Sequence, residues 1–178
     1  MKVRRLTLIG IAAILAACAS PPAGPGEPTP YINTDLGFRI DHPSNWEPIV
    51  DSDAIVPPQQ DTLHAVAFVD ADSGTAAIVY IQTLDRAETL ADCAARQIDG
   101  ILSQAPDAPL SDPEPIQLSG LDALLITTSF EANGQTLTTR LALAVKDSRG
   151  YALSLTAPAG SPRNAVLDEM LASFGVLP

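Results

Sequence analysis

The dipeptide Asn133-Gly134, which lies between two long alternating segments, constrains the fold of this chain more than any other feature. Asn-Gly is a strong signal for a two-residue hairpin, because both central residues of that turn favour a positive φ. Residues 122–131 and 135–146 therefore predict two antiparallel strands, and a turn at 147–150 leads into a third strand from Tyr151. We expect a three-stranded antiparallel meander with one apolar face.

The two faces of this meander are predicted to differ in polarity. The apolar face is expected to carry Leu137, Leu141, Leu143, Val145, Tyr151, Leu153 and Leu155. The second face is expected to carry small polar groups and one cation, namely Thr127, Ser129, Thr138, Arg140, Ser154 and Thr156. A helix or loop covers part of such a face, or the face is a docking surface; both alternatives stay open here.

Two helices flank the meander in the sequence. Thr89-Leu90-Ala91-Asp92 resembles a capping box and predicts a helix that runs to about Gln104. Ser161 as N-cap, with Pro162 at the first helical position, predicts a last helix that Gly175 ends. Further strands are expected at residues 37–40, 63–69 and 76–83, the last two separated by a turn at 70–74.

The first twenty residues predict export and a lipid anchor. Three basic residues precede a ten-residue apolar stretch, which is too short to span a bilayer and is typical of a signal peptide. The stretch ends in Leu15-Ala16-Ala17-Cys18, which resembles the bacterial lipobox, so lipidation is expected at Cys18. Ala19 follows in place of Asp, and the resemblance to bacterial lipoproteins then favours the outer over the inner membrane. The lipid on Cys18 is the expected membrane contact.

The chain is accordingly divided into three parts. Residues 1–17 are the predicted lipoprotein signal peptide, and residues 18–30 are the lipidated Cys with a Pro/Gly-rich linker. Residues 31–178 are expected to form one globular domain.

Charge excludes several classes of partner. Removing residues 1–17 takes three of the ten basic residues and none of the 21 acidic ones, which leaves a mature net charge of −14. Such a chain does not bind a phosphate backbone, so no nucleic-acid partner is expected. Its charge instead favours a basic partner.

Several landmarks resemble the PsbP/Mog1-like family. They are Gly37-Phe38-Arg39-Ile40 leading to Pro43 and Trp46, Gly120 before a long strand at Ala123, and Ser173-Phe174 in the closing helix. The resemblance implies an α+β fold, an α/β/α sandwich around a twisted antiparallel sheet, with Trp46 as a core residue. The family includes extrinsic proteins of photosystem II, a Ran-binding nuclear protein and many bacterial lipoproteins.

Candidate catalytic groups are few. His42 beside Asp41 is either a general base or a turn residue with a free imidazole, and we favour the second. His64 is expected at the surface or rim of a strand. Cys93 is either a redox or disulfide-forming thiol or a small core residue, and we favour the core. Without a nucleophile motif, we expect no catalytic residue and no enzyme.

Acidic loops offer a weak cation hypothesis. Asp51, Asp53, Asp61, Asp70 and Asp72 crowd the loops around the first strands. Asp70-x-Asp72-x-Gly74 resembles the start of a calcium loop, but Ile81 stands where a bidentate Glu is needed. Solvated loops are the simpler interpretation, so no metal ligand and no cofactor are expected.

The sequence favours a non-catalytic, lipid-anchored envelope protein that faces the periplasm and docks a protein or envelope component. The alternative is a lipoprotein that binds a small molecule or a divalent cation through its acidic loops. The Pro/Asp-rich stretch 105–115 is a candidate recognition loop, and the ligand-binding residues stay unknown.

Overall fold

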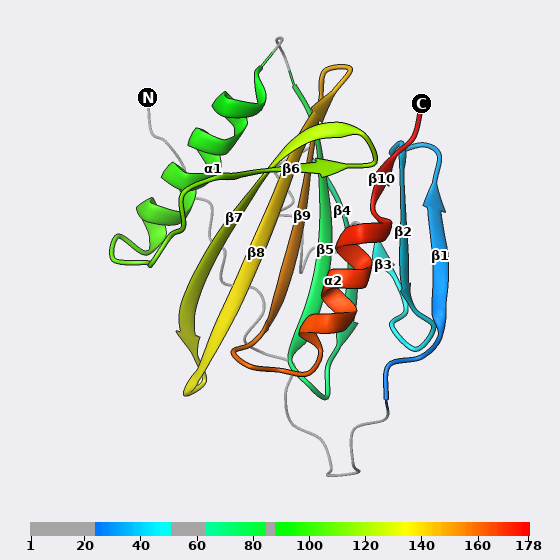
Figure 1. Cartoon of the computed structure of the whole chain (residues 1–178), viewed down its shortest axis with the longest axis vertical. Helices are drawn as coiled ribbons and strands as arrows, with labels where there is room; N and C mark the ends of the chain where they lie inside the picture. Colours follow the sequence, from blue (N-terminus) through cyan, green and yellow to red (C-terminus); the bar gives the residue numbers. More distant parts are fainter. Residues whose placement is uncertain (1–23, 51–62, 85–87) are drawn as a thin grey trace.

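The computed structural model describes residues 24–50, 63–84 and 88–178. Within these residues, a seven-stranded antiparallel sheet has the strand order β3-β4-β5-β9-β8-β7-β6, and a smaller sheet has the order β1-β2-β10 (Figure 1). The large sheet consists of β3 (Ile49–Val50), β4 (Leu63–Asp70), β5 (Thr75–Thr83), β6 (Glu114–Leu118), β7 (Leu121–Ala132), β8 (Gln135–Lys146) and β9 (Arg149–Pro158). The small sheet consists of β1 (Pro28–Asn33), β2 (Phe38–Pro43) and β10 (Gly175–Val176), and the helices are α1 (Leu90–Gln104) and α2 (Asn164–Ser173).

The two helices cover opposite faces of the large sheet. Leu153 of β9 packs in one core with α2 and the small sheet, whereas its neighbour Ala152 packs in a second core with α1. Successive side chains of a strand point to opposite faces, so the sheet is the middle layer. The predicted α+β fold with an antiparallel sheet between helices is confirmed.

The α2 side of the sheet holds the larger core. Its fully buried members include four aromatic side chains, Phe38, Trp46, Phe68 and Phe174. The rings of Phe38 and Phe174 stack with their centroids 6.0 Å apart. Trp46 is only 1% exposed, as the sequence predicts for a core residue behind the Pro43 turn.

The local signals for the hairpin and for α1 are confirmed. Asn133 and Gly134 both have positive φ, 51° and 73°, and join β7 to β8. Thr89 is the N-cap of α1, and the capping box with Asp92 is complete.

The predicted single apolar face of the meander is wrong. Leu141 and Leu143 pack on the α1 side, whereas Leu153 and Leu155 pack on the α2 side. The physical reason is the register of the β8–β9 pair: Leu141 lies opposite Ser154 and Leu143 opposite Ala152, so Leu153 and Leu155 point to the other face. Ala142 and Ala144 are core residues for the same reason.

The predicted polar face is divided in the same way. Ser129 and Thr138 share one face, with their hydroxyl oxygens 3.2 Å apart. Thr156 contacts Thr139, at 2.8 Å between hydroxyl oxygens, on the opposite face. The set that includes Ser154 and Thr156 is therefore not one docking surface.

Three boundaries differ from the prediction. Strand β1 begins at Pro28, inside the predicted linker, because an edge strand tolerates proline where its outward position needs no N–H. The N-cap of α2 is Arg163, not Ser161, whose hydroxyl accepts from the Arg163 N–H ahead of the helix.

Gly175 belongs to β10 and does not cap α2 through a left-handed conformation. A Cβ at this position would lie 2.8 Å from the Ser119 hydroxyl oxygen, so glycine permits the close approach of β10.

The short strands β3, β6 and β10 were not expected. Glu114 and Pro115, the end of the predicted loop 105–115, pair in β6 with β7. Cys18 and the signal peptide lie outside the described residues. Neither α1 nor α2 has the length and apolarity to cross a bilayer.

Candidate functional site

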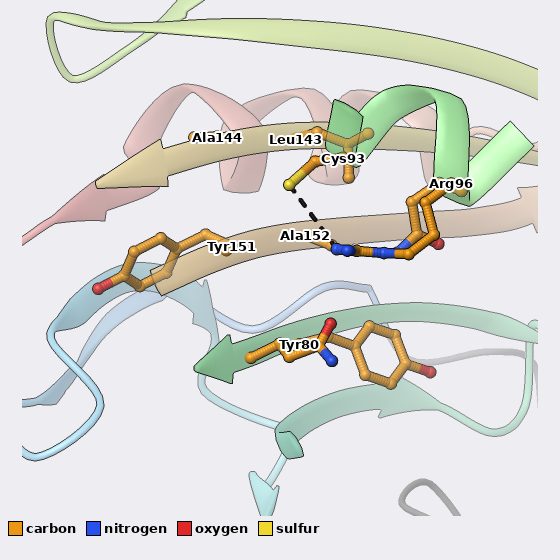
Figure 2. A pocket seen from close by; sticks show the side chains of 10 residues that line it. Tyr80, Cys93, Arg96, Leu143, Ala144, Tyr151 and Ala152 are labelled. Carbon is orange, nitrogen blue, oxygen red and sulfur yellow. Dashed lines mark hydrogen bonds between the residues drawn. The ribbon is translucent and has the colours of Figure 1, made fainter. Parts of the chain in front are cut away.

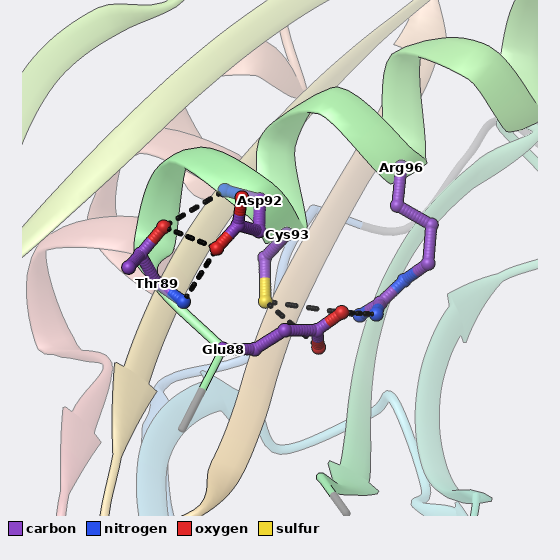
Figure 3. Close-up of polar contacts among 5 residues, drawn as sticks. All are labelled: Glu88, Thr89, Asp92, Cys93 and Arg96. Atoms are coloured by element: carbon purple, nitrogen blue, oxygen red, sulfur yellow. Dashed lines mark hydrogen bonds and ion pairs between the residues drawn. The ribbon is translucent and has the colours of Figure 1, made fainter. Parts of the chain in front are cut away.

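The first turn of α1 carries the densest polar network near a cavity. Thr89 donates from its backbone N–H (3.0 Å) and from its hydroxyl (2.7 Å) to one Asp92 carboxylate oxygen, and the Asp92 N–H donates to the Thr89 hydroxyl at 3.2 Å (Figure 3). These hydrogen bonds lower the pKa of Asp92 because they stabilise its ionised form. The network fixes the start of α1.

Cys93 follows in the same turn and lies against an ion pair. Its Sγ is 3.7 Å from a carboxylate oxygen of Glu88 and 3.7 Å from a guanidinium nitrogen of Arg96, and Arg96 pairs with Glu88 (Figure 3). Burial raises the pKa of the thiol, although the Arg96 charge opposes that shift. A reactive thiol has a lowered pKa, and the surroundings of Cys93 shift its pKa in the other direction.

A small cavity adjoins Cys93 between α1 and the sheet. Its volume is about 40 Å³, and its lining includes Tyr80, Arg96, Leu143 and Ala152 (Figure 2). Burial raises the pKa of the Tyr80 phenol, which stays neutral. A cavity of this size holds ordered water and is far below the several hundred Å³ of a typical ligand site.

His42 is not a turn residue with a free imidazole, contrary to the sequence interpretation. It lies in β2, is buried, and stacks on Phe68 with ring centroids 4.6 Å apart. Its Nδ1 is 2.9 Å from the Pro43 carbonyl oxygen. Asp41 is exposed on the other face of the strand, so the two side chains cannot form a catalytic pair. His64 is half-buried in β4.

The acidic loops are only partly described. Asp51, Asp53 and Asp61 lie outside the described residues. Asp70 forms an ion pair with Arg163, with 2.9 Å between Nε and Oδ2, and both side chains are 11% exposed. Asp70 thus neutralises a nearly buried cation, while Asp72 is exposed. No group of three or more potential metal ligands occurs in the described part of the chain.

The loop 105–113 is fastened to the edge of the sheet. The Ser111 N–H donates to the Thr127 carbonyl, and the Thr127 N–H donates to the Ser111 hydroxyl, both at 2.9 Å. On either side of this anchor, Asp107, Asp112 and Glu114 are exposed. The loop 105–113, with Glu114, is therefore an acidic rim that is anchored to β7 at Ser111.

A larger hollow lies where the β8–β9 turn meets the β1–β2 turn and the last residues of the chain. This open groove has a volume of about 540 Å³, and Gly37, Lys146, Arg149, Tyr151 and Leu177 line it. Sequence reasoning missed it because its walls come from segments more than one hundred residues apart. Only the glycine in the β1–β2 turn gave a local signal that a close approach was needed.

In a comparison with protein-family models, the model of the family described as DcrB matches residues 57–168. Comparison with curated protein sequences finds no significant match.

Among solved structures, cyanobacterial PsbP from Synechocystis superposes with a TM-score of 0.65 at 15% identity, covering 91% of this chain and 98% of that one. A Pseudomonas aeruginosa protein of unknown function, PA94, gives a TM-score of 0.53 at 16% identity, covering 86% and 99%. Mog1 gives 0.49 at 12% identity, covering 85% and 96%. The superposition on cyanobacterial PsbP confirms the predicted fold.

Proposed function

Because this chain belongs to the DcrB family, we propose that it is a non-catalytic, lipid-anchored protein of the cell envelope whose acidic domain docks a basic protein or envelope component. The DcrB family is a periplasmic envelope family, which fits a role at the cell envelope. The lipobox at Cys18 adds the anchor to this proposal, with the domain facing the periplasm and the outer membrane favoured.

The observation that carries the proposal is the distribution of charge over the described residues. Three of the cations, Arg96, Arg140 and Arg163, are neutralised by carboxylates of the same domain. The described carboxylates are otherwise exposed, since only Asp70 and Glu88 are partly buried. The surface that remains is strongly negative and steers a basic partner toward it.

The buried groups support a surface role over catalysis. His42 is packed against Phe68, and the Cys93 thiol, whose pKa is raised, lies beside a cavity of about 40 Å³. Both side chains are buried. The acidic rim, which consists of loop 105–113 and Glu114, is by contrast exposed to solvent. We assign the partner contact to this rim.

Two sets of substitutions separate the alternatives in a strain that depends on this protein. The combination of His42→Gln, His64→Ala and Cys93→Ser removes the candidate catalytic groups and should leave the cellular phenotype intact. Charge reversal of the rim, Asp107→Lys with Asp112→Lys and Glu114→Lys, should abolish it without unfolding the domain.

A matched control reverses three exposed carboxylates elsewhere, with Asp35→Lys, Asp41→Lys and Glu47→Lys. This control should reduce function much less, because the net charge changes equally but the rim is intact. A folded first combination without function would refute the non-catalytic proposal. Equal losses for rim and control would refute the assignment to the rim.

A further inference from the structure

We propose that the groove between the β8–β9 turn and the end of the chain binds the phosphate group of a small ligand or a lipid headgroup. The groove and the acidic rim share no residue, and the inference is independent of the docking proposal. Its wall is formed by the β1–β2 turn, which lies beside β10 and the chain terminus in Figure 1. At about 540 Å³ its volume is within the range of small-ligand sites.

The two cations that line the groove form no ion pair with a carboxylate of the described residues. Among the described residues, Arg39, Lys146 and Arg149 form no ion pair, and two of them line this groove. The Lys146 ammonium donates to the Leu177 carbonyl at 2.7 Å, and the Arg149 guanidinium donates to the Asp35 carbonyl at 3.3 Å. Neutral carbonyls orient these cations, and each cation has further N–H groups to donate.

A tyrosine hydroxyl opens onto the same groove. Tyr151 is 4% exposed as a whole residue, but its hydroxyl, which makes no hydrogen bond to another described residue, is not sealed from solvent. In Figure 2 its ring extends away from Arg96 and the small cavity, and the residue also lines the groove. A phenol hydroxyl can donate one hydrogen bond, so the Tyr151 hydroxyl is available to a group that accepts in the groove.

Two of the donor groups in the groove approach the same glycine, Gly37. A Cβ at Gly37 would lie 3.2 Å from a guanidinium nitrogen of Arg149 and 3.2 Å from the Tyr151 hydroxyl oxygen. The missing side chain therefore leaves both donors accessible at the same point of the wall. Together with Lys146 of β8, these two residues of β9 supply three donor groups, which suits a tetrahedral phosphate better than a two-oxygen carboxylate.

Asp147 is the one side-chain carboxylate that lines the groove. Its negative charge should weaken phosphate binding, so removing that charge should strengthen it. The residue is exposed and lies in the turn between the two cations, with φ of 50°. Asn tolerates a left-handed conformation as well as Asp does, so Asp147→Asn should keep the turn and tighten phosphate binding severalfold.

The test uses the full chain in phosphatidylcholine nanodiscs, titrated with inorganic phosphate while the Gly37 and Leu177 amide signals are followed by NMR. We expect saturable shifts, with binding weakened about tenfold by Arg149→Gln or Lys146→Gln and less by Tyr151→Phe. Arg39→Gln makes the same charge change outside the groove and should leave binding unchanged. A second arm replaces part of the phosphatidylcholine with phosphatidylglycerol and omits phosphate.

Shifts that need added phosphate identify a free ligand, whereas shifts caused by phosphatidylglycerol alone identify a headgroup. The proposal is overturned if neither arm shifts the two amides. It is also overturned if Arg39→Gln weakens binding as much as Arg149→Gln, because the effect would then be one of overall charge.

Discussion

The two faces of the seven-stranded sheet bury different chemistry. On the α2 side, Phe38, Trp46, Phe68 and Phe174 pack with no more than 1% exposure. On the α1 side, the buried residues form two small clusters, Ala94, Ile126 and Leu143 in one and Ala65, Ala67 and Ile78 in the other. The Cys93 thiol and the Tyr80 phenol lie at the small cavity on this side. The α2 face therefore supplies most of the stability, and the α1 face holds groups whose ionisation depends on the fold.

The largest expected effect tests this asymmetry in packing. Trp46→Ala should cost about 3–5 kcal/mol in free energy of unfolding, because it removes a large aromatic group from a filled core. The matched substitution on the other face, Ile126→Ala, should cost nearer to ~2 kcal/mol. Urea denaturation measures both, and equal losses would contradict the assignment of stability to the α2 face.

The next effect concerns the ion pair between Asp70 and Arg163. Asp70→Ala leaves a nearly buried guanidinium without this carboxylate and should cost about 3 kcal/mol. Asp168→Ala breaks the exposed pair with Arg140, in which the Asp168 side chain is 60% exposed, and should cost less than about 1 kcal/mol. A loss for Asp70→Ala no larger than that of Asp168→Ala would show that the first pair is effectively solvated.

A smaller effect concerns the cap that begins α1. Thr89→Ala removes the hydroxyl that accepts from the Asp92 N–H, and should cost about 1 kcal/mol. Thr89→Ser keeps the hydroxyl and should cost a few tenths at most. Thermal unfolding compares the two variants, and an equal loss for both would mean that the methyl group, and not the cap, matters.

The smallest effect is a pH dependence that only the α1 face should show. The pKa values of Tyr80 and Cys93 are raised in the folded state by burial, so the unfolded chain loses these protons first as the pH rises. Their contribution to stability is complete below the unfolded pKa values. It falls as the pH rises from the unfolded pKa values through the folded ones. The free energy of unfolding should thus fall above about pH 9, and Tyr80→Phe with Cys93→Ala should flatten that fall.

The features that the sequence predicted correctly depend on local interactions. The Asn133-Gly134 turn and the Thr89–Asp92 capping box each need only residues a few positions apart. The order of strands β7, β8 and β9 followed from short turns. Such signals are complete within one segment of the chain.

The features that the sequence missed depend on distant pairing. Ser154 and Thr156 were placed on the wrong face because the register of β9 on β8 sets Ser154 opposite Leu141 and Thr156 opposite Thr139. Both faces of β9 are covered by distant elements, α1 on one side and α2 with the small sheet on the other. His42 looked like a turn residue because nothing near it predicts Phe68 as its stacking partner. The groove at Gly37 needs three separate segments and has no sequence pattern of its own.

The central claim is that this protein acts through its acidic rim and not through its thiol or imidazole groups. In-cell photo-crosslinking from position 107, with a probe at position 47 as the matched exposed site, tests this claim most directly. We predict one discrete, salt-sensitive product from position 107 that survives His64→Ala with Cys93→Ser and is lost on Asp112→Lys with Glu114→Lys. A product that is lost with the thiol and imidazole but persists after charge reversal would contradict the account.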